Sequence, residues 1–230
     1  MGENLLLFGP PGVGKGTQAR RLSSAFAVPH IATGDMLRAA IQSHTPLGLR
    51  VADYLHAGQL VPDEIMVAVV NQRLGDPDVA RGFIMDGFPR TMRQAEVFGE
   101  FLAGDGQGPA RKPESKAERK IDGVIVLDAP VEALVARIAG RRTCESCQKS
   151  YHVTSHPAKV EGVCDRCGGT LVQRVDDAEA TVRFRLDEYA AKTKPVLDYF
   201  AKQRWPLLPV DAIGDIDQVF GRIYSAVLLS

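Results

Sequence analysis

The chain has few of the features that mark secreted, membrane or nucleic-acid-binding proteins. Its 230 residues include four cysteines and one tryptophan, and 28 basic residues balance 28 acidic ones. Zero net charge removes the electrostatic basis for non-specific nucleic-acid binding. No apolar run approaches the roughly 20 residues that a membrane span needs, and residues 1–8 lack the basic and apolar regions of a signal peptide. We therefore expect a cytoplasmic protein with reduced cysteines and no membrane or nucleic-acid partner.

The composition otherwise suits a globular protein with a substantial core, because 45% of the residues are hydrophobic and 24% are charged. Apolar runs predict five short strands, at residues 5–8, 29–33, 82–86, 123–128 and 206–211. Helical periodicity fills the gaps between them, with helices expected at residues 17–26, 35–42, from 62 onward and at 177–202. Pro195 should kink or divide the last of these. Alternating strands and helices predict a parallel sheet covered on both faces.

A glycine-rich segment follows the first strand directly. Gly9, Gly14 and Lys15 have the spacing G-x-x-x-x-G-K of a phosphate-binding loop. In such a loop the backbone N–H groups, the helix N-terminus and the lysine all favour an anion. The alternative is a glycine-rich turn that merely connects a strand to a helix. Gly16 departs from the general pattern, because a Ser or Thr that binds magnesium usually stands there and the hydroxyl of Thr17 comes one position later.

The cysteines form one cluster in the sequence. Cys144 and Cys147 make one C-x-x-C pair, and Cys164 and Cys167 make the second. This spacing is typical of a zinc site in which four thiolates surround the ion. Four protein ligands leave no open position for water, so the expected role is structural. Two disulfides or a redox-active dithiol are the alternatives.

Residues 104–120 are rich in glycine, proline and mixed charges and contain hardly any apolar residue. Such a segment cannot bury a face, which predicts a solvated loop. A functional basic patch is the alternative, but acidic residues are interspersed among the basic ones.

Several sequence blocks resemble the signatures of the adenylate kinases. Residues 9–18 are similar to that family's G-x-P-G-x-G-K-G-T loop, and residues 34–38 and 86–91 are similar to its two other signature blocks. The resemblance continues through residues 137–142, the cysteine segment and Asp176-Asp177. Gly16 followed by Thr17 is then the family's own form of the loop. The resemblance implies reversible transfer of the terminal phosphoryl group of ATP to AMP, giving two ADP, with Mg²⁺ and a structural Zn²⁺.

The element order and the resemblance together predict a P-loop NTPase three-layer α/β fold with a five-stranded parallel sheet. We expect three parts. The core comprises residues 1–32, 62–139 and 178–230, residues 33–61 form a helical AMP-binding insert, and residues 140–177 form a zinc-binding lid. The zinc replaces a hydrophobic core that so small a lid cannot build. The family resemblance favours a monomer.

Phosphoryl transfer needs in-line positioning and charge neutralisation rather than covalent help from the protein. The resemblance implies that the catalytic residues are Lys15, Asp86, Arg90, Arg137, Arg141, Arg174 and Arg185. It implies that ATP contacts Gly12, Val13, Gly14, Lys15, Gly16, Thr17, Arg137, Arg141, Ser150, Tyr151 and Gly214. Arg137, Arg141, Arg174 and Arg185 would converge on the transferring group when the lid closes and excludes water.

Three of these assignments have alternatives. Asp86 would organise magnesium through water, or it caps a helix. Tyr151 would lie over the ATP base, or it is a packing residue. Asp176 and Asp177 would tie the lid to the arginines, or they cap the helix that follows.

For AMP, the resemblance implies contacts to Thr33, Gly34, Arg38, Gln59, Leu60, Val61, Gly87, Phe88, Pro89, Arg90, Gln94, Arg174 and Arg185. Arg38 and Arg90 would hold the phosphate, since planar guanidinium groups pair with phosphate oxygens in a bidentate manner. The Gln94 amide has a donor and an acceptor that match the Watson–Crick edge of adenine. A UMP/CMP-type kinase and a zinc-ribbon nucleic-acid-binding protein with a vestigial phosphate loop are the competing functions.

Overall fold

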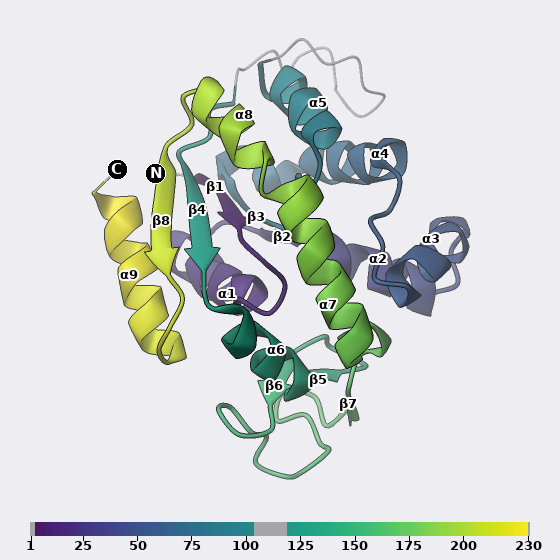
Figure 1. The fold of residues 1–230 in the computed structure, drawn as a ribbon. Coiled ribbons are helices and arrows are strands. Elements are labelled where there is room, and N and C mark those ends of the chain that lie inside the picture. Colours follow the sequence, from purple (N-terminus) through teal and green to yellow (C-terminus); the bar gives the residue numbers. More distant parts are fainter. Residues whose placement is uncertain (1–2, 104–118, 230) are drawn as a thin grey trace.

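The computed structural model describes residues 3–103 and 119–229. Its centre is a five-stranded parallel sheet with the strand order β2-β3-β1-β4-β8, and helices cover both faces (Figure 1). The strands are β1 (Asn4–Phe8), β2 (His30–Ala32), β3 (Phe83–Asp86), β4 (Gly123–Asp128) and β8 (Leu207–Asp211). Each strand predicted from the sequence is present, and the predicted three-layer α/β fold is confirmed.

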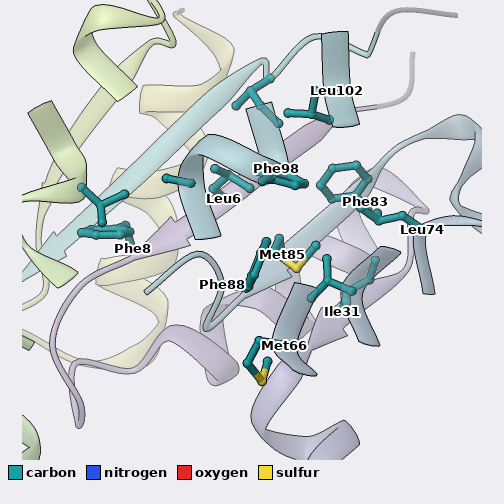
Figure 2. Packing of buried hydrophobic residues seen from close by; sticks show 14 of the residues in the cluster. Leu6, Phe8, Ile31, Met66, Leu74, Phe83, Met85, Phe88, Phe98 and Leu102 are labelled. Atoms are coloured by element: carbon teal, nitrogen blue, oxygen red, sulfur yellow. The ribbon is translucent and has the colours of Figure 1, made fainter. Parts of the chain in front are cut away.

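Strand β1 lies between two hydrophobic cores. Because side chains alternate along a strand, Leu6 and Phe8 pack into one core and Leu5 and Leu7 into the other. The first core also holds Phe83, Phe98 and other large side chains from β3 and α5 (Met92–Ala103), packed closely together in Figure 2. Burial on both faces explains why the strands are continuous apolar runs rather than alternating patterns.

The core to which a helix contributes shows which face of the sheet that helix covers. Helices α4 (Asp63–Leu74), α5 and α8 (Val196–Lys202) contribute to the core of Leu6 and Phe8. Helices α1 (Lys15–Phe26), α6 (Val131–Ala139) and α9 (Ile216–Leu228) contribute to the core of Leu5 and Leu7. The sheet is therefore rigidly sandwiched, which fixes the loops at the carboxyl ends of its strands.

Two smaller units leave this core. Helices α2 (Thr33–Gln42) and α3 (Pro46–His56) follow β2 and precede α4 along the chain, and they pack on each other. After α6 the chain forms an antiparallel sheet with the order β6-β5-β7, seen below α6 in Figure 1. Its strands are β5 (Arg141–Cys144), β6 (Ser150–His152) and β7 (Leu171–Val172), and the short helix η2 (Val175–Asp177) follows it.

A further short 3-10 helix, η1 (Pro77–Arg81), precedes β3 in the core.

The helix predicted over residues 177–202 is divided into three pieces. Helix α7 (Glu179–Glu188) is followed by the π-helical turn η3 (Tyr189–Thr193) and then by α8. Pro195 has no N–H and its ring clashes with the carbonyl four residues earlier. The chain responds before the proline by widening one turn, in which the Lys194 N–H donates to the Tyr189 carbonyl at 2.8 Å. The division was predicted, but its position was not.

The loop predicted at residues 104–120 lies almost entirely outside the described residues. Within residues 3–103 and 119–229, none of the helices has the length and apolar character that a membrane crossing requires.

The end of α1 gives a first testable prediction. Ala27, exposed at the C-cap, has φ 53° and ψ 42°, a left-handed conformation that costs about 1–2 kcal/mol for a residue with a Cβ. Ala27→Gly should therefore raise the free energy of unfolding by about 0.5–1 kcal/mol in urea denaturation. The matched control is Ala136→Gly at an exposed position inside α6, where glycine should lower stability by about 1 kcal/mol. A loss of stability at both positions would contradict the prediction.

Candidate active site and metal centre

The loop between β1 and α1 is held tightly against β4. Gly9, Gly12 and Gly14 all have positive φ, at 144°, 83° and 102°. A Cβ on Gly9 would lie 2.4 Å from the Leu127 carbonyl oxygen, so no other residue fits there. The Lys15 ammonium group folds back over the loop and donates to the carbonyl oxygens of Gly9 at 2.6 Å and Pro10 at 2.9 Å. Loop and lysine thus form one preorganised cationic unit.

Lys15 at the start of α1 and Asp86 at the end of β3 are two half-buried charged groups that influence each other. Burial lowers the pKa of Lys15 to about 7, against a partly opposing effect of Asp86. Burial alone would raise the pKa of Asp86, but His30, Lys15 and Arg90 outweigh it and hold that pKa below its ordinary value. Asp86 is therefore an ionised carboxylate at neutral pH.

The position of Asp86 gives a physical reason for Gly16. A Cβ on Gly16 would lie 3.3 Å from Asp86 Oδ2, which is tighter than most real contacts. A larger Ser or Thr side chain would crowd this carboxylate. The glycine keeps the space between the loop and Asp86 open.

Two pockets meet at a shared wall, and the first of them adjoins the loop. The first is lined by Gly9, Pro11 and Lys15 of the loop together with residues of β1, of the segment after β3 and of α7–η3. The second is lined largely by the α2–α3 unit and its flanking segments. Arg90 and Arg185 line both pockets. A group held in one pocket is therefore close to a group held in the other.

Five arginines gather at and beside this wall, of which Arg90 and Arg185 line both pockets. They are Arg38 from α2, Arg90 after β3, Arg141 from β5, Arg174 before η2 and Arg185 from α7. Burial lowers the pKa of Arg90 to about 10, with repulsion from Arg185 adding to the effect. Burial likewise lowers the pKa of Arg174 to about 9, with repulsion from Arg38 and Arg141 adding. The cluster is a crowded set of buried cations that repel one another.

Aspartates hold the arginines in place without neutralising all of them. Asp177, fully buried, accepts a two-point ion pair from Arg141, which outweighs burial and raises the pKa of that arginine. Asp176 pairs with Arg185 at 2.8 Å, and Asp35 pairs with Arg38. The Nε–H groups of Arg38 and Arg174 are buried without a hydrogen-bond partner among the described residues. Unpaired buried donors on repelling cations mark a site for a polyanion.

Asp176 and Asp177 therefore act as ties to the arginines. The alternative, in which they cap the next helix, is wrong: the N-cap of α7 is Ala178, and no side chain caps that end.

The sequence of this chain is similar to those of known proteins whose function suits a polyanion site. The family profile described as adenylate kinase matches residues 7–205. The chain belongs to the adenylate kinase family. It is 48% identical over 223 residues to an adenylate kinase of Carboxydothermus hydrogenoformans, covering 97% of this chain and 98% of the relative. It is 46% identical over 225 residues to an adenylate kinase of Syntrophobacter fumaroxidans, covering 98% and 99% of the two chains.

The second pocket contains most of the residues that the family resemblance assigned to AMP. They are Thr33, Gly34, Arg38, Gln59, Leu60, Val61, Gly87, Arg90, Gln94 and Arg185. Phe88 and Pro89 instead line the first pocket. Arg174 lines neither, but it lies 3.7 Å from Asp35 beside Arg38.

Gln94 is buried, and the protein already uses part of its amide. Its Oε1 accepts from the Arg90 N–H at 2.8 Å, and its Nε2 donates to Asp63 Oδ1 at 2.8 Å. An amide has two donor hydrogens and two acceptor lone pairs, so one of each remains for a ligand. Sequence reasoning missed Asp63, which fixes this amide and also accepts from Thr91. From the sequence, Asp63 directly after Pro62 indicated only the start of a helix.

Arg137 and Gly214 lie away from the arginine cluster. Arg137 donates to the Ala212 carbonyl at 2.8 Å, just after β8. Gly214 follows in the same turn with φ 120°. The four arginines expected to converge are therefore split: Arg141, Arg174 and Arg185 share the cluster, and Arg137 is held at the turn after β8.

The four cysteine sulfurs form a compact group. All lie within 4.8 Å of one another, with 3.5 Å between the sulfurs of Cys144 and Cys167 and 3.6 Å between those of Cys147 and Cys164. A zinc ion 2.3 Å from each of four tetrahedral thiolates sets the sulfurs about 3.8 Å apart. All four cysteines are free rather than disulfide-bonded. The cluster can hold a metal ion, and four thiolates are a set that zinc accepts.

Ser150 and Tyr151 lie next to this cluster in β6. Tyr151 is 4% exposed, and its hydroxyl lies 3.4 Å from the Cys164 sulfur. The side chain faces the cysteines, as the packing alternative predicted, so only its backbone remains for a nucleotide contact. Ser150 is half-buried and alternates to the other face of the strand.

Proposed function

We infer that this adenylate kinase family member catalyses reversible transfer of the terminal phosphoryl group of ATP to AMP, giving two ADP. The observation that carries this function is the buried arginine cluster at the wall between two pockets, one beside the phosphate-binding loop and the other beside the α2–α3 unit. In-line phosphoryl transfer needs a donor and an acceptor on opposite sides of such a charge-neutralising wall. The names of the relatives support the same reaction.

On the ATP side, we propose that the loop amides of residues 12–17 and Lys15 hold the phosphates. Lys15 would exchange its bonds to the Gly9 and Pro10 carbonyls for phosphate oxygens. Arg137, Ser150, the backbone of Tyr151 and Gly214 would contact the rest of the nucleotide. Their position along the lid and the turn after β8 supports this assignment.

On the AMP side, Arg38 and Arg90 would hold the phosphate, and Thr33, Gln59–Val61 and Gln94 would surround the base. Thr33 is buried and its hydroxyl donates to the Gly87 carbonyl at 3.0 Å, so it is fixed at the pocket wall. The unused donor and acceptor of Gln94 fit adenine, which offers one acceptor and one donor on its Watson–Crick edge.

Between the two nucleotides, Arg90, Arg141, Arg174 and Arg185 would neutralise charge on the moving phosphoryl group. Electrostatic stabilisation by preorganised cations is the main contribution a protein makes to this chemistry. Mg²⁺ arrives with ATP. Asp86 suits its hydration shell because it is an ionised carboxylate facing the open space at Gly16.

We further propose three working parts. Residues 1–32, 62–139 and 178–230 form the core, residues 33–61 bind AMP, and residues 140–177 form a lid closed around a structural zinc ion at Cys144, Cys147, Cys164 and Cys167. The compact lid sheet and the group of four sulfurs support this division. Free thiols suit a cytoplasmic protein. We expect a monomer, which sedimentation of the purified protein will test.

A coupled assay with ATP and each of AMP, CMP, UMP and GMP tests the function. Turnover should be highest with AMP by a wide margin. A preference for CMP or UMP would contradict the assignment and favour a pyrimidine nucleoside monophosphate kinase. Replacing ATP by GTP as donor in the same assay tests the donor site.

The lowered pKa of Lys15 predicts pH-dependent ATP binding. With a pKa of about 7 in the free protein, Lys15 is increasingly neutral as the pH rises from 7 to 9. A phosphate group favours the protonated amine, so ATP binding above pH 7 must take up a proton. Affinity should fall with rising pH, approaching tenfold per pH unit above 8.

Calorimetric titration with ATP at pH 8, in two buffers of different ionisation enthalpy, measures the proton uptake. We expect nearly one proton per ATP for the unmodified protein and a much smaller number for Lys15→Met. Equal heats in the two buffers would show that Lys15 stays charged throughout.

A further inference from the structure

Tyr151 lies on the metal side of a two-sided lid sheet. Residues directly opposite in an antiparallel pair point to the same face. The pairs Arg142–Tyr151 and Cys144–Leu171 therefore share one face. Thr143 is opposite both Ser150 and Val172 and shares the other face with Arg141, which reaches Asp177 in the cleft. The sheet thus separates the cysteine cluster from the catalytic cleft.

The hydrogen bonds of the Tyr151 hydroxyl have a definite direction. The Asp165 N–H can only donate, and it donates to the Tyr151 oxygen at 2.9 Å. The hydroxyl hydrogen is then left for the Cys164 sulfur at 3.4 Å. A metal-bound thiolate is an acceptor only, so this direction fits the loaded site.

The aromatic ring has two further contacts that hold it in place. The His156 ring stacks on it at 5.8 Å between centroids with an interplanar angle of 15°, and the Lys149 ammonium lies 4.9 Å from its centroid. With the ring fixed, the hydroxyl has one orientation relative to Cys164. The Arg166 N–H also points at this sulfur, at 3.4 Å.

We propose that Tyr151 is a positioning residue of the metal site, and that its hydroxyl donates a hydrogen bond to the metal-bound thiolate of Cys164. The inference rests on the proposed occupancy of the cysteine cluster by a metal ion. The hydrogen bond orients the Cys164 sulfur before the metal arrives. Outer partners of this kind typically change metal affinity by 10–100-fold.

The test is Tyr151→Phe in the full-length protein, which removes the hydroxyl and keeps the ring. Zn²⁺ affinity is measured by competition with a chromophoric chelator, and Co²⁺ loading is followed by absorption. We expect Zn²⁺ binding about 10–100-fold weaker than in the unmodified protein. At saturating Co²⁺ the tetrahedral spectrum should return, with the sulfur-to-cobalt band at longer wavelength because the thiolate has lost a hydrogen bond.

Thr143→Val is the matched control. It removes a hydroxyl from the neighbouring strand on the opposite face of the same sheet. Thr143 is 3% exposed and its hydroxyl has no hydrogen-bond partner among the described residues. Its metal affinity and Co²⁺ spectrum should equal those of the unmodified protein.

The outcomes separate the two proposals. If the unmodified protein binds neither metal, the proposed metal site fails. If it binds Zn²⁺ and Tyr151→Phe binds equally well, the role of Tyr151 is overturned while the metal site stands. The position of the sulfur-to-cobalt band is the second measurement. If Tyr151→Phe binds Zn²⁺ more weakly but its Co²⁺ band at saturation equals that of the unmodified protein, Tyr151 acts through packing alone, and this also overturns the inference.

Discussion

Replacing Lys15 by alanine is expected to lower phosphotransfer by at least about 1,000-fold while the protein stays folded. Lys15 is the only cation that belongs to the phosphate-binding loop itself, and it already bridges two loop carbonyls. Without it, the loop amides still bind phosphate, but no full charge follows the phosphoryl group into the transition state. Removing one such preorganised group typically costs 100–1,000-fold in turnover, and a full charge contributes more than a neutral donor.

The loss should appear mainly in kcat, because the interaction strengthens as charge develops on the moving group. The free energy of unfolding should change little. Withdrawing the ammonium group from water costs free energy that its two hydrogen bonds only partly offset, so its removal is not strongly destabilising. Coupled assays and thermal unfolding measure the two effects. Lys202→Ala, at an exposed position at the end of α8, is the matched control and should keep normal turnover. Near-normal turnover of Lys15→Ala would contradict the proposed role of the loop.

Stripping the metal with a chelator is expected to lower the thermal unfolding temperature by about 10 °C or more. The lid has only a small hydrophobic cluster of its own, centred on Cys144, Tyr151 and Cys164. A ligand at about 1,000 times its Kd contributes about 4 kcal/mol to the folded state, and 1 kcal/mol shifts the unfolding temperature of a chain this size by roughly 2–4 °C. The stripped protein should still fold at low temperature, because the two hydrophobic clusters of the core contain no lid residue.

Thermal unfolding with and without chelator measures this effect, and readdition of Zn²⁺ should reverse it. Cys147→Ser should reproduce the loss in the presence of Zn²⁺. Ser146→Ala, in the same turn between the first two cysteines, should not. Phosphotransfer at low temperature should be reduced but not abolished, since the arginines outside the lid remain. An unchanged unfolding curve after stripping would rule out a structural metal.

The elements that could be predicted from the sequence are those whose signals are local. The five strands are continuous apolar runs, and the phosphate-binding loop is one uninterrupted segment between a strand and a helix. The cysteine pairs are also local, since each pair occupies a single turn. Pro195 predicted a break in the long helix, but the π turn begins at Tyr189 because the backbone accommodates the proline before reaching it.

The contacts within the site were less predictable. Gln94 was expected to contact the adenine base, and the structure adds that Asp63 and the Arg90 backbone each use one end of its amide. For Tyr151 a place over the ATP base and a packing role were both open, and its side chain faces Cys164. Arg137 was grouped with the other arginines for the closed lid, and in this structure it donates to the Ala212 carbonyl. Asp63, Cys164 and Ala212 lie 31, 13 and 75 residues from their partners along the chain, so no local pattern encodes these pairings.

The sequence by itself determined the phosphate-binding loop, the positions of the five apolar strands, the metal-binding spacing and the family, because each depends on residues close together along the chain. Only the tertiary structure decided that Arg38, Arg90, Arg141, Arg174 and Arg185 share one buried volume and that Tyr151 lies on the metal side of the lid sheet. Charge repulsion, burial and hydrogen bonding act through distances in space, and the fold alone sets those distances.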